Sequence, residues 1–136
     1  MNAEAAADWL DVADRDEAAA TLLLNAAPPQ IETAIYHVQQ WIEKTIKGLL
    51  TLENIHPPHT HDLERLEAAL PAPHPLGSAV AKVSAYGGWA VMARYPDVDP
   101  ATADPLPSVR KVRDVMADAA ALRDAVRKRI EAASTT

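Results

Sequence analysis

Apolar residues recur at intervals of three and four along most of the chain, which is the spacing that places them on one face of an α-helix. The alternation of apolar and polar residues that is typical of β-strands is absent. The widest apolar face lies between residues 31 and 50 and consists of Ile31, Ala34, Ile35, Val38, Trp41, Ile42, Thr45, Ile46, Leu49 and Leu50. The pattern therefore predicts an all-α fold.

Proline-rich segments divide the periodic pattern into about five helices, one of them short. We expect these helices over residues 5–24, 28–54, 62–70, 78–94 and 108–132. The first helix is expected to turn Trp9, Val12, Ala13, Ala20, Leu23 and Leu24 inward, and the last helix Val112, Met116, Ala119, Leu122, Val126 and Ile130. At 136 residues the chain suits a single domain, residues 1–136, with an up-and-down helical bundle as its architecture.

Composition narrows the class of protein. The chain has no cysteine, which excludes a disulfide framework, a thiolate nucleophile and a cysteine-based metal site. Its formal net charge of −6 argues against broad, non-specific binding of nucleic acid. The first residues, MNAEAAADWL, do not resemble a signal peptide, and no stretch is apolar enough for a membrane span. We therefore expect a cytoplasmic protein without a membrane partner.

A stripe of hydrogen-bonding side chains runs beside the wide apolar face. His37, Gln40, Lys44 and Lys47 follow the same helical spacing on another side of the helix. One interpretation is a solvated face, because charged residues on helices are usually exposed. The other is a groove for an anion or nucleotide, since two lysines one turn apart create a local positive field and the other two residues supply directional hydrogen bonds.

Charges of opposite sign concentrate in the first and last helices. The N-terminal segment is rich in Asp and Glu, whereas the last helix ends with several Arg and Lys residues. An antiparallel arrangement would place these charges near each other. The helix macrodipole offers a simpler explanation, because acids favour helix starts and bases favour helix ends.

Two adjacent glycines, Gly87 and Gly88, fall inside the predicted helix over residues 78–94. Each costs a helix roughly 1 kcal/mol relative to alanine, so we expect them to permit close packing against a neighbour. Together with Trp89 they predict a flat interface for a homodimer.

Three motifs follow one another along the chain. The first consists of His37, Gln39, Gln40, Glu43, Lys44 and Lys47. The second is Thr60-His61-Asp62-Leu63, at the turn into the predicted short helix, and the third is Arg94-Tyr95-Pro96, at the end of the fourth predicted helix. Together the three motifs resemble those of the HEPN family of helical domains, and the resemblance extends over nearly the whole chain. The resemblance implies a helical bundle, usually dimeric, that is associated with nucleotide or RNA binding. It is often encoded beside a minimal nucleotidyltransferase as a toxin–antitoxin-like pair.

The chain departs from the ribonuclease members of that family. These carry an Arg followed, after four to six intervening residues, by a His, and no His stands at that distance from Arg94 or Arg65. Without such a pair there is no evident general acid or base for RNA cleavage. We therefore expect no catalytic residue, and we favour a non-catalytic module that binds a nucleotide or regulates a partner. The alternative is a degenerate ribonuclease toxin that uses His61 with Arg94.

The residues expected to contact a ligand come from the polar stripe and from the two other motifs. An aromatic at a helix end beside a guanidinium, as in Tyr95 and Arg94, suits a base and a phosphate. The complete set is His37, Gln40, Lys44, Lys47, His61, Asp62, Arg94 and Tyr95. For Asp62 there is a simpler alternative role, that of the cap of the short helix. We expect no cofactor and no metal, although His56, His59 and His61 lie close together in the sequence.

Overall fold

The computed structural model describes residues 2–89 and 105–135, and this part of the chain contains five helices and no strand. The helices are α1 (Ala3–Leu24), α2 (Ile31–Leu52), α3 (Leu63–Ala68), α4 (Gly77–Ser84) and α6 (Val109–Ser134). The predicted all-α bundle is confirmed. No helix of the described part is long and apolar enough to cross a membrane.

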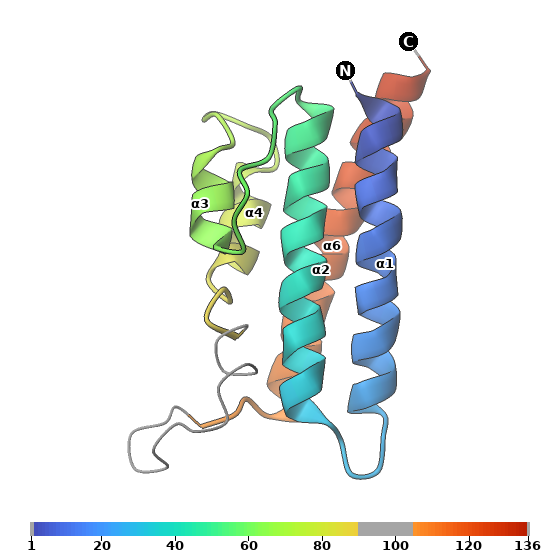
Figure 1. Cartoon of the computed structure of the whole chain (residues 1–136), viewed down its shortest axis with the longest axis vertical. Helices are drawn as coiled ribbons and strands as arrows, with labels where there is room; N and C mark the ends of the chain where they lie inside the picture. The colour runs from blue at the N-terminus through green and yellow to red at the C-terminus, as the bar shows by residue number, and fades with distance from the viewer. Residues whose placement is uncertain (1, 90–104, 136) are drawn as a thin grey trace.

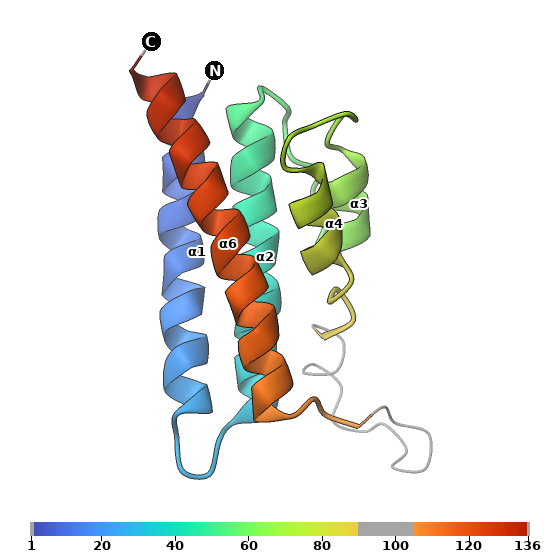
Figure 2. The same ribbon diagram turned by 180° about the vertical axis from the view of Figure 1, so that it is seen from behind.

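Three long helices form the body of the bundle, and two short ones cover one side of it. Figure 1 shows α1 running in the opposite direction to α2 and α6, so that both termini lie at the same end. Seen from behind in Figure 2, α6 crosses in front of α1 and α2, while α3 and α4 lie beside α2. The central helix α2 therefore contacts every other described helix.

The core is built on the wide apolar face of α2, as the sequence predicts. Every member of that face is buried except Ile31, which is half-buried. The reason is that α2 lies in the middle of the bundle and meets neighbours on several sides. The inner face of α6 is also as predicted, except that Val115 is buried and Met116 lies at the edge.

The inner face of α1 differs in part from the expected one. Leu10 is fully buried, whereas Val12 is 36% exposed and Trp9 is half-buried. The buried residues of α1 are Ala6, Leu10, Ala13, Asp16, Ala20 and Leu24, which repeat at three and four along one narrow line. Because half of them are alanine, α1 can approach α2 closely.

α1 approaches α2 closely at Gly48, a residue that the sequence pattern did not single out. A Cβ atom placed on Gly48 would overlap Leu10 Cδ2 and would lie 3.1 Å from Trp9 Cβ and 3.3 Å from the backbone oxygen of Ala6. Glycine at this position therefore has a packing role, since no larger residue fits without moving its neighbours.

The predicted role of Gly87 and Gly88 is wrong in one respect. The helix α4 ends at Ser84, and the two glycines lie in the turns that follow rather than inside a helix. Glycine is a poor helix former, so a pair of them favours an end to the helix before it. A Cβ on Gly88 would meet nothing within 4 Å. Within this chain, close packing therefore does not require glycine at position 88.

The opposite charges of α1 and α6 do meet. Arg123 lies 3.2 Å from Asp14 and 2.9 Å from Glu17, and Arg127 lies 3.0 Å from Asp11 and 2.8 Å from Asp14. Partial burial by itself lowers the pKa of Arg123, but the hydrogen bonds that Arg123 donates to Glu17 and to Asp124 raise that pKa above its ordinary value. The ion pairs thus favour the antiparallel pairing that the sequence suggested.

Candidate functional site

The polar stripe forms a continuous side of α2, which we call the polar face of α2 and define by His37, Gln40, Lys44 and Lys47. Its first half is organised by a carboxylate of α1. Asp16, whose side chain is only 10% exposed, has Oδ1 at 2.8 Å from His37 Nδ1 and accepts a 2.6 Å hydrogen bond from Lys44 through Oδ2. One buried acid therefore fixes a histidine and a lysine that are two helical turns apart.

The second half of the polar face is organised by Glu43, from α2 itself. This side chain is 4% exposed, and its Oε2 accepts a 3.0 Å hydrogen bond from Lys47. Its Oε1 lies 2.9 Å from Nδ1 of His61, which comes from the loop between α2 and α3. The ammonium of Lys47 also lies 5.7 Å from the centroid of the Trp9 ring, close enough for a cation–π contact.

Two buried glutamines hold the loop that carries His61. The amide nitrogen of Gln39 donates a 3.0 Å hydrogen bond to the backbone oxygen of His61, and Gln40 donates a 2.8 Å bond to the amide oxygen of Gln39. Both glutamines are buried. Gln40, predicted as a ligand-binding residue, is thus committed to a partner within the chain, and the pair fixes the backbone of His61 while Glu43 fixes its ring.

These contacts change the electrostatic picture of the polar face. Each of its two lysines has a nearly buried carboxylate at ion-pair distance, so Lys44 and Lys47 do not form an unopposed positive patch. Buried carboxylates with this geometry restrict the lysine and histidine side chains to defined positions. The face therefore presents oriented hydrogen-bond donors rather than a strong excess of charge.

The structure brings together only some of the predicted site residues. His37 and Lys44 share Asp16, whereas Lys47 and His61 share Glu43, so the four residues form two clusters. Arg94 and Tyr95 lie outside the described residues. Sequence reasoning missed Asp16, although an acid at an inward position of an otherwise apolar helix face was a signal that could have identified it.

Asp62 acts as the cap of α3, which was the simpler of its two interpretations. Its Oδ1 accepts a 3.0 Å hydrogen bond from the backbone nitrogen of Glu64, and its own backbone nitrogen donates to Thr60 Oγ1 at 3.1 Å. Asp62 is therefore not the carboxylate that orients His61. That role belongs to Glu43.

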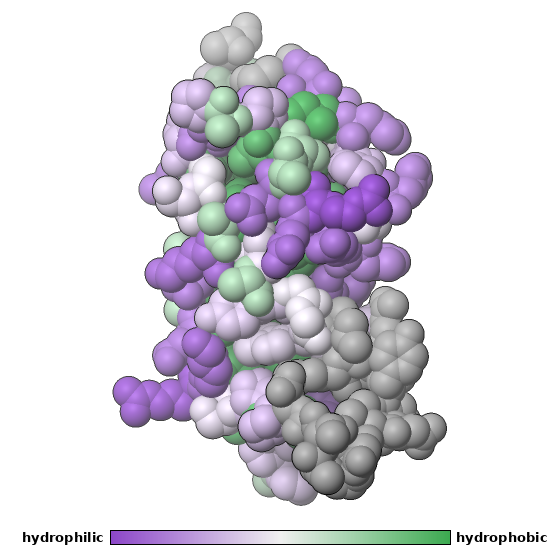
Figure 3. All heavy atoms as spheres, turned by 90° about the vertical axis from the view of Figure 1, so that its left-hand side faces the viewer, coloured by the Kyte–Doolittle hydropathy of each residue, from purple (hydrophilic) through white to green (hydrophobic). Residues whose placement is uncertain are grey.

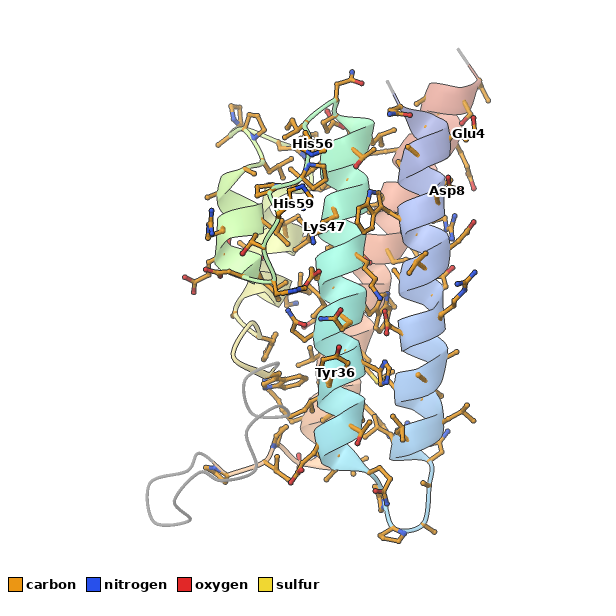
Figure 4. All side chains as sticks on the ribbon, viewed as in Figure 1. Glu4, Asp8, Tyr36, Lys47, His56 and His59 are labelled. Atoms are coloured by element: carbon orange, nitrogen blue, oxygen red, sulfur yellow. The ribbon has the colours of Figure 1, made fainter. Side chains whose placement is uncertain are left out.

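The other two histidines of this loop, His56 and His59, contact each other. Figure 4 shows His56 and His59 on the loop after α2, and their ring centroids are 5.8 Å apart in an edge-to-face arrangement. Within residues 2–89 and 105–135, no group of three or more His, Asp or Glu side chains is arranged to hold a metal ion.

A third polar cluster joins α2, the linker before α4, and α6. Arg129 donates a 2.8 Å hydrogen bond to Glu53 Oε1, and His74 Nε2 lies 3.6 Å from the same oxygen. Burial by itself raises the pKa of Glu53, but the hydrogen bonds and charges of Arg129 and His74 lower it below its ordinary value of 4.5. This cluster anchors the linker to the bundle.

A groove with a volume of about 780 Å³ lies between α3 and α4 and does not coincide with the polar face of α2. None of the predicted site residues lines it. The polar face of α2 and this groove are therefore separate features of the surface.

Comparison with known protein families identifies a match over most of the chain. The family model described as the HEPN domain matches residues 6–129, which include all of α2, α3 and α4 and most of α1 and α6. No curated protein and no solved structure matches the chain significantly.

Proposed function

Because the chain belongs to the HEPN domain family, we propose that it is a non-catalytic, cytoplasmic module whose polar face of α2 binds a nucleotide phosphate or regulates a protein partner. Membership of this family places the chain among nucleotide-binding and ribonuclease-type modules. The proposal selects binding over catalysis, and the observation that carries it is the pairing of each lysine and histidine of the face with a nearly buried carboxylate.

Preorganised donors support the binding role. Lys44 retains two further N–H donors beyond the one that it gives to Asp16, and its side chain is 22% exposed. His37, at 27% exposure, is held beside it by the same carboxylate. Because these side chains are already ordered, they lose less conformational entropy when a phosphate binds. The carboxylate also offsets the lysine charge, so we expect the affinity for a free nucleotide to be weak.

The non-catalytic part of the proposal is supported by the arginines and by the motif. Arg123, Arg127 and Arg129 of α6 are each engaged with acids of the bundle. The sequence contains no His at the ribonuclease spacing after Arg94 or Arg65. A cleft for RNA cleavage needs both a positioned imidazole and a phosphate-binding cation, and this chain does not supply them at the family's spacing.

ATP is expected to bind weakly at low ionic strength, with an affinity that falls as salt is added, since phosphate contacts by lysine are screened. Substituting Lys44→Ala or Arg94→Ala should cost about 1.5 to 3 kcal/mol each, the range for hydrogen bonds to charged groups. Calorimetric titration of ATP and GTP into the parent and both variants measures this. If both substitutions leave the affinity unaltered, the polar face of α2 is a solvated surface and not the nucleotide site.

One observation favours the alternative, a degenerate ribonuclease. His61 is 62% exposed, and the hydrogen bond from its Nδ1 to Glu43 leaves its Nε2 as the proton-accepting nitrogen. A carboxylate-oriented imidazole is a common arrangement for a general base. We nevertheless rank it second, because no phosphate-binding arginine or nucleophile is described beside it.

We expect no cleavage of single-stranded RNA or tRNA above background, and a gel assay with the purified protein tests this. Cleavage that is lost in His61→Ala but retained in His59→Ala, a histidine of the same loop, would establish the ribonuclease instead. Loss of cleavage in the His61 variant would exclude a contaminating nuclease, and the His59 variant controls for changes in the loop.

We propose that the module acts as a homodimer, with the surface around Gly88 at the interface. Trp89, included in the predicted interface, is 8% exposed and lies 5.0 Å from the Tyr86 ring, so it packs mainly within its own chain. Gly88 is exposed and has open space around it.

Sedimentation is expected to show a dimer at micromolar concentration, and Gly88→Leu should shift it towards the monomer. Since a Cβ at Gly88 meets no atom within 4 Å, the substitution should leave the folded chain intact, which thermal unfolding checks. A parent protein that sediments as a monomer would contradict the dimer, and a Gly88→Leu variant that remains dimeric would exclude this surface.

For the protein partner we propose a minimal nucleotidyltransferase in a toxin–antitoxin-like pair, which the family resemblance implies. The polar face of α2 would then be shared between nucleotide and partner. Co-expression with a nucleotidyltransferase encoded beside this chain should yield a complex that Lys44→Ala weakens. Separate elution of the two proteins would exclude the pairing.

A further inference from the structure

The surface of α1 carries a shallow hollow next to the polar face of α2. It has a volume of about 310 Å³ and is lined by Ala5, Asp8, Trp9 and Val12. Val12 is 36% exposed and Trp9 is half-buried, so apolar surface remains open to solvent here. The hollow lies away from α3 and α4, whose side of the molecule is shown in Figure 3 with hydrophilic side chains next to hydrophobic ones.

Trp9 connects the hollow with the polar face of α2. The ammonium of Lys47 lies 5.7 Å from the centroid of the Trp9 ring. Figure 4 shows Lys47 on α2 and Asp8 on α1 at a similar level of the bundle. Lys44 follows one turn away from Lys47, about 4.5 Å along the helix axis. A ligand that places its phosphates on these lysines therefore has the Trp9 ring within reach of its other end.

A partly exposed tryptophan beside a lysine suits the base of a nucleotide. Every base has a π-face that stacks on an aromatic ring, and the neighbouring ammonium is a donor for the phosphates of the same molecule. A volume of about 310 Å³ is at the lower end of the range for small-molecule sites. The hollow therefore suits a single base.

Asp8 gives the hollow a preference among the bases. Its side chain is exposed and forms no ion pair with another described residue, whereas Asp11 and Asp16 of the same helix each have a cationic partner. A carboxylate accepts hydrogen bonds and donates none. The Watson–Crick edge of guanine presents two adjacent N–H donors, whereas that of adenine presents one donor beside an acceptor. Asp8 can thus form two parallel hydrogen bonds with guanine and only one with adenine.

Resting on the nucleotide site proposed above, we propose that its ligand is a free guanine nucleotide. The base stacks on Trp9 and pairs with Asp8, while the phosphates contact Lys47 and Lys44. The Watson–Crick edge lies at the end of the base opposite the ribose, so the carboxylate of Asp8 and the phosphates are kept apart. The hollow thereby supplies the specificity that a phosphate site alone lacks.

The test is calorimetric titration of the full chain with GTP and ATP at low ionic strength. We expect GTP to bind at least fivefold more tightly than ATP. Asp8→Asn should weaken GTP at least fivefold without weakening ATP, because an asparagine amide offers both a donor and an acceptor to adenine. The matched control is Glu4→Gln, which removes an exposed charge of α1 outside the hollow and should change the ratio of the two affinities less than twofold.

Inorganic tripolyphosphate separates this inference from the phosphate site on which it rests. Trp9→Leu should weaken GTP at least fivefold and change the affinity for tripolyphosphate less than twofold, whereas Lys44→Ala should weaken both. If Lys44→Ala weakens tripolyphosphate but GTP and ATP bind equally well to the parent, the phosphate site stands and guanine is overturned as the preferred base. If neither nucleotide nor tripolyphosphate binds, the proposed function fails as well.

Two further measurements test the stacking and the source of the guanine. The indole N–H signal of Trp9 in a ¹⁵N spectrum, assigned with Trp9→Leu, should shift with GTP and not with tripolyphosphate. A signal that GTP leaves unchanged would overturn the stacking. A 5′-phosphorylated guanosine trinucleotide should bind no more tightly than GTP, and tighter binding of the trinucleotide would overturn a free nucleotide as the ligand.

Discussion

Replacing Gly48 by valine is expected to lower the free energy of unfolding by about 3 kcal/mol, the upper end of the range for overpacked cores. The added Cβ would overlap Leu10 Cδ2, and Leu10 is fully buried and has little room to move. The neighbouring Trp9 Cβ and Ala6 backbone oxygen are less able to move, because they could shift only together with the backbone of α1. Helix propensity alone would favour valine by only a few tenths of a kcal/mol, which does not offset the overlap.

Gly77→Ala is the matched control, since Gly77 begins α4 and a Cβ there meets nothing within 4 Å. We expect it to raise the free energy of unfolding by about 0.5 to 1 kcal/mol, because alanine restricts the unfolded chain and favours the helix. Urea denaturation followed by circular dichroism measures both variants. A Gly48→Val protein as stable as the parent would show that α1 and α2 do not approach this closely.

Breaking the Glu43–Lys47 pair is the second change with a large expected effect. Lys47→Met removes the lysine partner of a carboxylate that is 4% exposed, and truncating one member of a buried pair typically costs about 3 to 5 kcal/mol. The loss arises because the remaining carboxylate stays buried with only His61 as an ionisable partner.

The double variant Glu43→Met/Lys47→Met should recover most of that loss, since well-packed apolar residues often replace a buried ion pair without penalty. Urea denaturation of the two single variants and the double variant gives the coupling energy directly. If Lys47→Met costs less than about 1 kcal/mol, the pair behaves as a surface ion pair and the polar face of α2 is not organised by Glu43.

The sequence was informative where periodicity decides the structure. The burial of α2 follows from its wide apolar face, and the helix ends near residues 24 and 52 follow from the Pro-rich and polar breaks after them. The choice between Leu10 and Val12 on α1 could not be made from periodicity alone. Both lie near the apolar side of the helix, and only the position of α2 decides which of them is covered.

The candidate site was harder to predict, because the contacts of its carboxylates join residues that lie far apart in the sequence. Asp16 lies on α1, 21 residues before His37, and their contact depends on the register of α1 against α2. His61 could be assigned to its neighbour Asp62 in sequence, whereas in the fold it contacts Glu43, 18 residues earlier. Pairing across helices depends on tertiary packing, which a single sequence does not specify at the level of individual side chains.

Nuclear magnetic resonance mapping of ATP binding tests the central claim most directly, namely that the polar face of α2 is the nucleotide site. Amide and side-chain shifts of uniformly ¹⁵N-labelled protein would be followed during titration at low ionic strength, with the Lys44→Ala variant in parallel. We predict that the largest shifts fall on residues around His37, Lys44, Lys47 and His61, and that they diminish in the variant. Shifts confined to other surfaces, or none at millimolar ATP, would contradict the account.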